Sequence, residues 1–212
     1  MKCRIPIARE GWPFIFPGMI LLTVAIVLRY EMLASFLGIA TLCIAMFFRD
    51  PERKIRRDDK MILSPADGRV LQIVPLENQG KESSYTQQIS IFMSVFNCHI
   101  NRVPLSGKII TCEYHPGQFL PAFREKASDL NEKNTVYLEN DHMKIGIRQI
   151  AGLIARRIVC RIKPGDLVNQ GSRFGLIRFG SRVDLLLPSN AKVIVNPGQK
   201  VKAGLSHIAQ IK

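Results

Sequence analysis

The sequence lacks the cysteine patterns that would assign it to a disulfide-rich or zinc-binding class. Its five cysteines (Cys3, Cys43, Cys98, Cys112 and Cys160) are widely spaced, and no C-x-x-C pair occurs. An odd and scattered set argues against both a disulfide framework and a structural metal site. Reduced thiols in a cytoplasmic compartment, and no bound metal, are therefore expected.

Acidic side chains are also scarce. Asp and Glu number 17 against 30 Lys and Arg, which leaves a formal net charge of +13. A field of this sign suits a polyanion, either nucleic acid or an anionic membrane surface. Aromatic residues form only 8% of the chain, and no basic run is interleaved with them as in single-strand binders. An anionic membrane is thus the expected partner, and nucleic acid is not.

Charge is absent from two stretches near the N-terminus, residues 12–28 and 32–48. As helices each would span roughly 25 Å, which is the short end of what crosses a bilayer. Residues 1–49 are therefore predicted to form a membrane hairpin of two apolar helices. A re-entrant anchor is one alternative, because Pro13, Pro17 and Gly18 interrupt the first stretch. Two buried core helices of a soluble domain are the other.

Basic residues flank both stretches, and only Arg29 lies between them. The flanking residues are Lys2, Arg4, Arg9, Arg49, Arg53, Lys54, Arg56 and Arg57. By the positive-inside rule, both ends of the hairpin lie in the cytoplasm. The prediction is a cell-membrane protein with a basic linker at residues 50–62 and a soluble domain at residues 63–212 on the cytoplasmic face.

The soluble part contains two short motifs that recur along the chain, called the first and the second echo. The first comprises "PADGRV" (65–70), "PLSGKI" (104–109) and "PSNAKV" (188–193), and the second "PGDLVNQG" (164–171) and "PGQKVKAG" (197–204). A turn followed by a strand, repeated in this way, predicts hairpins that fold into a sandwich or barrel-like sheet. Residues 90–105 predict one long apolar strand, and residues 118–133 predict a helix. The expected fold class is mainly β (α+β), an antiparallel domain with one or two short helices.

A strand near the C-terminus is interrupted. Residues 176–188, "LIRFGSRVDLLLP", place Gly180 and Ser181 between strand-forming side chains. Glycine inside a strand usually marks a bulge or a close backbone approach. A serine hydroxyl can also attack the preceding glycyl carbonyl in an N→O acyl shift, if the geometry is fixed and a base is near. Elimination of the ester leads to a pyruvoyl group, which does the work of PLP with the protein's own atoms.

Two residues elsewhere supply the groups that such a serine needs. "ILSPADGRV" puts Asp67 in a turn between apolar residues, and "FNCHINRVP" puts His99 at the end of the long strand. Asp, His and Ser brought together from distant segments form a constellation that activates a hydroxyl. An Asx turn at Asp67 and a packed strand-end histidine at His99 are the structural alternatives.

A carrier domain is the rival function. Biotinyl and lipoyl carriers also repeat P-G-x-x-V-x-x-G and present a modified lysine at a hairpin tip, and "DHMKIG" (141–146) offers Lys144. The turn residues "ENDH" place Lys144 on the returning strand instead of in the turn. Carriers also tend to be acidic and soluble. A membrane-tethered carrier or binding module without backbone cleavage is therefore the weaker hypothesis.

Six segments in fixed order carry a family resemblance. They are "FFRDPER", "SPADGRV", "FNCHINRVPLSG", "KASDLNEKN", "IAGLIARRIVC" and "GDLVNQGSRFGLIRFGSRVDLLLP". From about residue 46 onward, and with the N-terminal hairpin, the chain resembles the short membrane-anchored form of phosphatidylserine decarboxylase. The resemblance implies a pyruvoyl-dependent carboxy-lyase, without metal or PLP, that converts phosphatidylserine to phosphatidylethanolamine in phospholipid biosynthesis.

The same resemblance implies a proenzyme. Self-cleavage between Gly180 and Ser181 would yield a β chain of residues 1–180 and an α chain of residues 181–212. The two chains would stay together as a heterodimer, and the family suggests a dimer of these. Ser181 would become the pyruvoyl group that forms a Schiff base with the substrate amine.

The resemblance also implies roles for further residues, by their positions in the matching segments. Asp67 matches the family's processing aspartate, and His99 matches the first of two paired histidines. The chain has Arg102 where longer members have the second histidine, and "FGSR" where they read L-G-S-T. His99 is the expected base for the serine, oriented by Asp67, with His115 and then His142 as alternatives. Substrate or lipid contacts are expected from Arg102, His115, Arg56 and Arg57.

Overall fold

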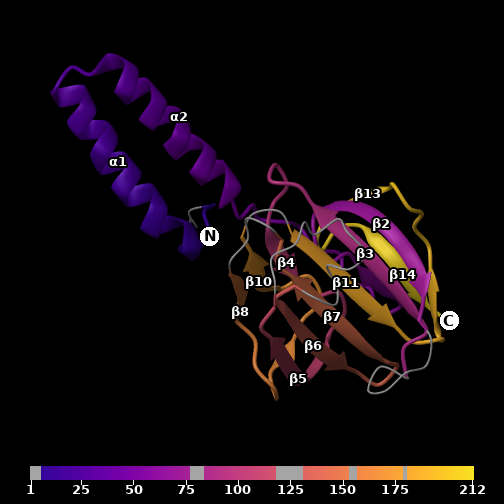
Figure 1. Ribbon diagram of the computed structural model, residues 1–212. Coiled ribbons are helices and arrows are strands. Elements are labelled where there is room, and N and C mark those ends of the chain that lie inside the picture. The colour runs from indigo at the N-terminus through magenta and orange to yellow at the C-terminus, as the bar shows by residue number, and fades with distance from the viewer. Residues whose placement is uncertain (1–5, 77–83, 118–130, 153–156, 179–180) are drawn as a thin grey trace. The chain divides into compact units, whose positions relative to one another are not determined.

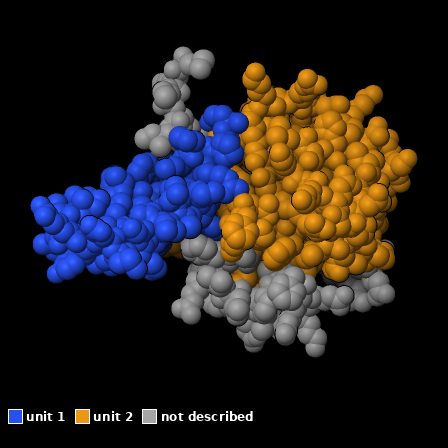
Figure 2. Space-filling view, turned by 90° about the horizontal axis from the view of Figure 1, so that it is seen from above, with its two compact units in different colours: residues 1–52 blue, residues 53–212 orange. Residues whose placement is uncertain are grey.

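The computed structural model describes residues 6–76, 84–117, 131–152, 157–178 and 181–212. The chain divides into two compact units, Met1–Glu52 and Arg53–Lys212 (Figures 1 and 2). Each unit has its own architecture, and each is described by itself below.

The first unit is a helical hairpin. A short 3-10 turn, η1 (Arg9–Gly11), leads into α1 (Trp12–Val27), and α2 (Glu31–Phe47) follows. These bounds agree within one residue with the stretches expected at 12–28 and 32–48. The helices approach closely at Gly18, where an added Cβ would lie 2.6 Å from Thr41 Oγ1.

Most apolar side chains of the hairpin are exposed. Phe16, Ile20, Ile26 and Phe36 are each more than half exposed, which argues against a pair of buried core helices. The segment Arg9–Val27 is long and apolar enough to cross a membrane, whereas Glu31–Phe47 is a shorter apolar helix. The exposed surface is the kind that a bilayer covers.

The second unit is antiparallel and mainly β, which confirms the predicted fold class. Its largest sheet has eight strands in the order β13-β2-β3-β11-β7-β6-β5-β9 (Figure 1). Their bounds are β13 (Lys200–Val201), β2 (Gly68–Pro75), β3 (Gln87–Met93), β11 (Ser181–Leu187), β7 (Lys144–Ile150), β6 (Lys133–Glu139), β5 (Gly107–His115) and β9 (Leu167–Val168).

Two three-stranded sheets complete the unit. One has the order β1-β14-β12 and the other β4-β10-β8. Their bounds are β1 (Met61–Leu63), β14 (His207–Ile211), β12 (Ala191–Val193), β4 (Ile100–Arg102), β10 (Arg173–Ile177) and β8 (Ile158–Cys160). The core lies between these strands and one face of the large sheet, and includes Ile91, Ile147, Val183, Phe174 and Ile208.

The two sequence echoes are structural repeats. Each copy of the first begins a strand at its fourth residue, at Gly68, Gly107 and Ala191. Glycine is required at the first of these positions, because a Cβ on Gly68 would stand 2.0 Å from the carbonyl oxygen of Phe92. The second echo encloses β9 and β13. Its glycines adopt positive φ, a conformation that L side chains rarely take: Gly165, Gly171, Gly198 and Gly204.

The strand expected over residues 90–105 is in fact two strands, and this expectation was wrong. β3 ends at Met93, and β4 begins at Ile100 in a different sheet. The break has a local cause: the Asn97 side-chain oxygen accepts hydrogen bonds from both the amide (2.9 Å) and the hydroxyl (3.0 Å) of Ser94. Such a side-chain bond closes a turn that competes with the sheet ladder.

The strand expected over residues 176–188 is also divided. β10 ends at Ile177 and β11 begins at Ser181, and the two strands belong to different sheets. Ser181 is therefore the first residue of the strand that the chain forms after leaving the sheet of β10. The helix expected at 118–133 falls outside the described residues except at its end, where residue 133 begins β6.

Candidate active site

Three segments meet at one edge of the large sheet. Asp67 directly precedes β2, Met93 ends β3, and Ser181 begins β11, and these strands are neighbours in the order β2-β3-β11. The register places Arg69 opposite Phe92 and Ser181 opposite Met93. Asp67 and Ser181 therefore lie at the same end of the sheet, on either side of the end of β3.

Ser181 is fully buried, with 0% of its surface exposed. Its hydroxyl donates a long contact of 3.8 Å to the sulfur of Met93. A thioether is a weak acceptor, so this contact does not hold the hydroxyl strongly in place. Gly180, whose carbonyl the hydroxyl would attack, lies outside the described residues.

His99 is bound to the turn at the same edge. It is 2% exposed, and its Nδ1 lies 3.0 Å from the carbonyl oxygen of Asn97. A carbonyl only accepts, so Nδ1 carries the hydrogen and the neutral ring has its lone pair on Nε2. Asn97 is tied in turn to Ser94, which follows Met93. His99 therefore lies between the turn that follows Met93, the residue opposite Ser181, and the start of β4.

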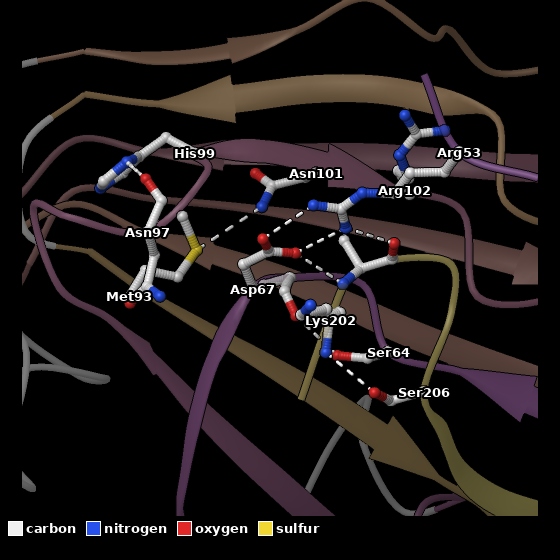
Figure 3. A network of polar contacts seen from close by, with 12 residues as sticks. Arg53, Ser64, Asp67, Met93, Asn97, His99, Asn101, Arg102, Lys202 and Ser206 are labelled. Carbon is white, nitrogen blue, oxygen red and sulfur yellow. Dashed lines mark hydrogen bonds and ion pairs between the residues drawn. The ribbon is translucent and has the colours of Figure 1, made fainter. Parts of the chain in front are cut away.

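Asp67 is held by an arginine and by a backbone amide. Arg53 donates from Nη1 to Oδ1 (2.6 Å) and from Nη2 to Oδ2 (2.8 Å) of the carboxylate, and the Ala203 amide donates to Oδ1 (2.7 Å) (Figure 3). These hydrogen bonds do not include one to His99. The carboxylate reaches this edge of the sheet, but its orientation is set by Arg53 and Ala203.

The remaining predicted residues lie in different surroundings. Arg102 is 4% exposed on β4 and donates from Nη1 to the Gly171 carbonyl at 2.9 Å. His115 ends β5, with a half-exposed side chain 4.0 Å from Glu113. Arg56 and Arg57 are exposed on the linker, and His142 is exposed in the loop before β7.

The family is decided by comparison with known proteins. Residues 40–209 match the phosphatidylserine decarboxylase family. The chain belongs to this family. It is 46% identical to the phosphatidylserine decarboxylase proenzyme of Syntrophus aciditrophicus, with 97% of this chain and 98% of that protein aligned. The proenzymes of Geotalea uraniireducens (45% identity; 94% and 93% aligned) and Desulfotalea psychrophila (43%; 100% and 99%) are similar over nearly the whole chain.

The comparisons confirm the resemblance expected from the sequence. Phosphatidylserine decarboxylases are pyruvoyl-dependent carboxy-lyases, and the relatives are proenzymes. The carrier hypothesis finds no support in them. Lys144 begins β7, where its ammonium group lies 5.8 Å from the centre of the Tyr137 ring, as for an ordinary strand lysine.

Polar groups that the sequence analysis did not single out also lie in the interior of this decarboxylase. Asn101 donates to the Met93 sulfur (3.7 Å) and accepts from Gln149 (2.8 Å), whose amide oxygen accepts from Asn134 (3.2 Å). All three amides are 6% exposed or less. The sequence did contain a signal for this network, since Asn101 and Gln149 lie inside the apolar segments "FNCHINRVP" and "IRQIAG". A buried amide needs hydrogen-bond partners, so such residues are expected to bond to one another.

Two half-buried thiols, Cys112 and Cys160, form a second cluster. The sulfur atoms of Cys112 and Cys160 lie 3.8 and 3.7 Å from the carbonyl oxygen of Ile162. The hydrogen bond from Cys112 lowers the pKa of Cys160 to about 7, against the opposing effect of burial. The same bond, with burial, raises the pKa of Cys112. Within the described ranges no group of three or more His, Cys, Asp or Glu side chains could hold a metal ion.

Proposed function

We propose that this chain decarboxylates phosphatidylserine to phosphatidylethanolamine with a pyruvoyl group that it makes from Ser181. The observation that supports the proposal is topological: Asp67 directly precedes β2 and a fully buried Ser181 begins β11 at the same end of the sheet, and His99 follows the turn that leaves β3 between them. Burial keeps water away from the Ser181 hydroxyl, and an intramolecular acyl shift requires that this hydroxyl meet a base and the preceding carbonyl in a fixed geometry.

Self-cleavage proceeds through the chain's own atoms. His99 Nε2 takes the hydroxyl proton as Ser181 Oγ attacks the carbonyl carbon of Gly180, and the amide nitrogen of Ser181 leaves to become an amine. Elimination then removes the Cα proton of residue 181 to a base as the Cβ–Oγ bond breaks, which frees the carboxylate of Gly180 and leaves dehydroalanine. Addition of water and loss of ammonia convert dehydroalanine to the pyruvoyl ketone. The products are a β chain of residues 1–180 and an α chain of residues 181–212.

The residues of the site have separate tasks. The Asn97 carbonyl fixes His99 in the tautomer whose Nε2 accepts a proton. Asp67, whose hydrogen bonds come from Arg53 and the Ala203 amide, supplies a negative charge that stabilises the imidazolium. When formed, the pyruvoyl group withdraws the electron pair that the departing CO₂ leaves behind. His99 returns a proton to the substrate carbon.

A lipid substrate is consistent with the surface next to the site. The turn between Met93 and His99 exposes 84% of Phe96 and 41% of Val95. An apolar turn tip beside a catalytic edge suits contact with the acyl region of a bilayer. Arg56 and Arg57, exposed on the linker, suit lipid phosphates. These features support an enzyme that works on an anionic membrane, at the cytoplasmic face that the basic flanks indicate.

Intact-mass spectrometry of the purified full-length protein tests the proposal. Wild type should give two chains, with the smaller one beginning at a pyruvoyl-blocked residue 181. Ser181→Ala should give only the uncleaved chain of 23.9 kDa and no decarboxylation of phosphatidylserine vesicles. Asp67→Asn should cleave slowly. An active preparation that consists of uncleaved chain alone would refute the proposal.

A further inference from the structure

We propose that Arg53, in the linker that follows the membrane hairpin, is the positioning residue of Asp67 for self-cleavage. The inference rests on the proposed function and adds the linker to the processing site. It starts from the contacts of one guanidinium group, which touches both Asp67 and the future α chain.

The Arg53–Asp67 pair differs from an ordinary surface salt bridge. Its two hydrogen bonds run in parallel at 2.6 and 2.8 Å, and the side chains are only 9% and 12% exposed. Exposed pairs contribute little because solvent screens them. A two-pronged bond to a guanidinium, shielded from water, fixes the plane of a carboxylate as well as its charge. Arg53 therefore determines how Asp67 is oriented.

The backbone of Ala203 forms hydrogen bonds with both members of the ion pair. Arg53 Nη1 donates to the Ala203 carbonyl at 2.6 Å, and the Ala203 amide donates to Asp67 Oδ1 at 2.7 Å. Arg53, Asp67 and the Ala203 peptide thus form a ring of hydrogen bonds, and Figure 3 shows the Arg53 and Asp67 side chains facing each other. Cleavage before Ser181 would put Ala203 on the α chain and the two charged residues on the β chain. The ring joins both products around the carboxylate.

The linker that carries Arg53 is itself anchored. An added Cβ on Gly171 would stand 2.5 Å from Ile55, and one on Gly204 would stand 3.0 Å from it, so Ile55 packs against both glycine turns. The amide of Asp58 donates to the side-chain oxygen of Gln170 at 2.9 Å. Because the linker is fixed in this way, Arg53 loses little conformational entropy when it forms its hydrogen bonds.

Only arginine fits this role. Its planar fork donates in parallel to both carboxylate oxygens, whereas a lysine ammonium acts as a point charge. Arg53→Lys keeps the charge beside Asp67 but removes the parallel bonds. A role limited to charge balance predicts normal processing by this variant. A positioning role predicts slow processing, because small misplacements of a catalytic group cost on the order of 10²-fold in rate.

The experiment follows self-cleavage of freshly synthesised full-length chains in phosphatidylglycerol-containing vesicles by mass spectrometry. We expect Arg53→Lys to cleave about 10- to 100-fold more slowly than wild type. Arg69→Lys is the matched control, because Arg69 is exposed two residues beyond Asp67, and it should cleave normally. Arg53→Ala should cleave more slowly still and should be accelerated by added methylguanidinium, which can replace the missing fork.

Two results would overturn the inference: wild-type cleavage by Arg53→Lys, or an Arg53→Ala variant that methylguanidinium does not accelerate. The second result would assign Arg53 to the fold alone. Ser181→Ala, run in parallel, separates this inference from the proposed function. If Ser181→Ala is still cut, the proposed function fails; if it stays intact while Arg53→Lys is processed normally, only the role of Arg53 fails.

Discussion

The buried ion pair on β11, directly after Ser181, allows a quantitative test of how this strand is stabilised. Arg182 Nε donates to Asp184 Oδ1 at 2.6 Å, with side chains that are 2% and 0% exposed. Ser90 accepts a second bond from Arg182 at 2.7 Å, and Gln88 donates to the other carboxylate oxygen at 3.1 Å. These groups lie on the face of β11 opposite the apolar core, because side chains alternate along a strand.

The expected magnitude follows from burial. At 2.6 Å and an effective dielectric constant of 20, the attraction is about 6 kcal/mol. Desolvation of both ions offsets most of this, so the pair as a whole contributes little net stability. Asp184→Leu removes only one partner and leaves the Arg182 guanidinium buried without its counter-charge. We expect it to lower the free energy of unfolding by about 3 to 5 kcal/mol.

A double-mutant cycle separates these effects. Asp184→Leu, Arg182→Met and the double variant should be compared in the uncleaved Ser181→Ala background, as full chains in detergent micelles, by urea unfolding. The double variant should regain most of the loss, because two apolar side chains replace two ions. Lys144→Met serves as a control on the neighbouring strand. A loss below about 1 kcal/mol for Asp184→Leu, as for an exposed pair, would refute the reasoning.

The remaining predictions concern the surface turn and the thiols. Phe96→Ser should raise the KM for phosphatidylserine in vesicles several-fold. It should leave the extent of self-cleavage unchanged, because the Phe96 side chain is 84% exposed. An unchanged KM would show that this turn does not contact the membrane. Cys160, with its pKa lowered to about 7 by Cys112, should be alkylated by iodoacetamide with a midpoint near pH 7, since the thiolate forms as the pH rises through the pKa. Cys112, with a raised pKa, should stay unmodified at that pH; peptide mass spectrometry measures both, and preferential alkylation of Cys112 would contradict the assignment.

Local patterns predicted the parts of the fold that depend on local interactions. The uncharged stretches marked both helices, because a run of apolar residues of this length is sufficient to identify them. The echoes marked the starts of β2, β5 and β12, because each begins at a turn with its own residue requirements. The long strand over residues 90–105 failed because Asn97 closes a turn by a side-chain bond, which hydrophobicity does not reveal.

The sequence predicted which residues belong to the candidate site but not which side chains they contact. Ser181, Asp67 and His99 were named from their residue types and their positions next to turns. That Asp67 and Ser181 lie at the same end of the sheet depends on the order β2-β3-β11, which brings together two residues more than a hundred positions apart in the chain. Arg53 was expected only among the basic residues near the anchor, since nothing in a charged linker shows which arginine turns inward.

The sequence by itself determined the family, the hairpin and the Gly180–Ser181 pair, because these depend on residues that are adjacent in the chain or in a recognisable order. Only the tertiary structure decided which charges meet. Arg53 reaches Asp67 across 14 residues, and Ala203 reaches the same carboxylate across 136. Such pairings depend on how the strands and turns pack together, and a buried charge must find its partner wherever the packed chain presents one.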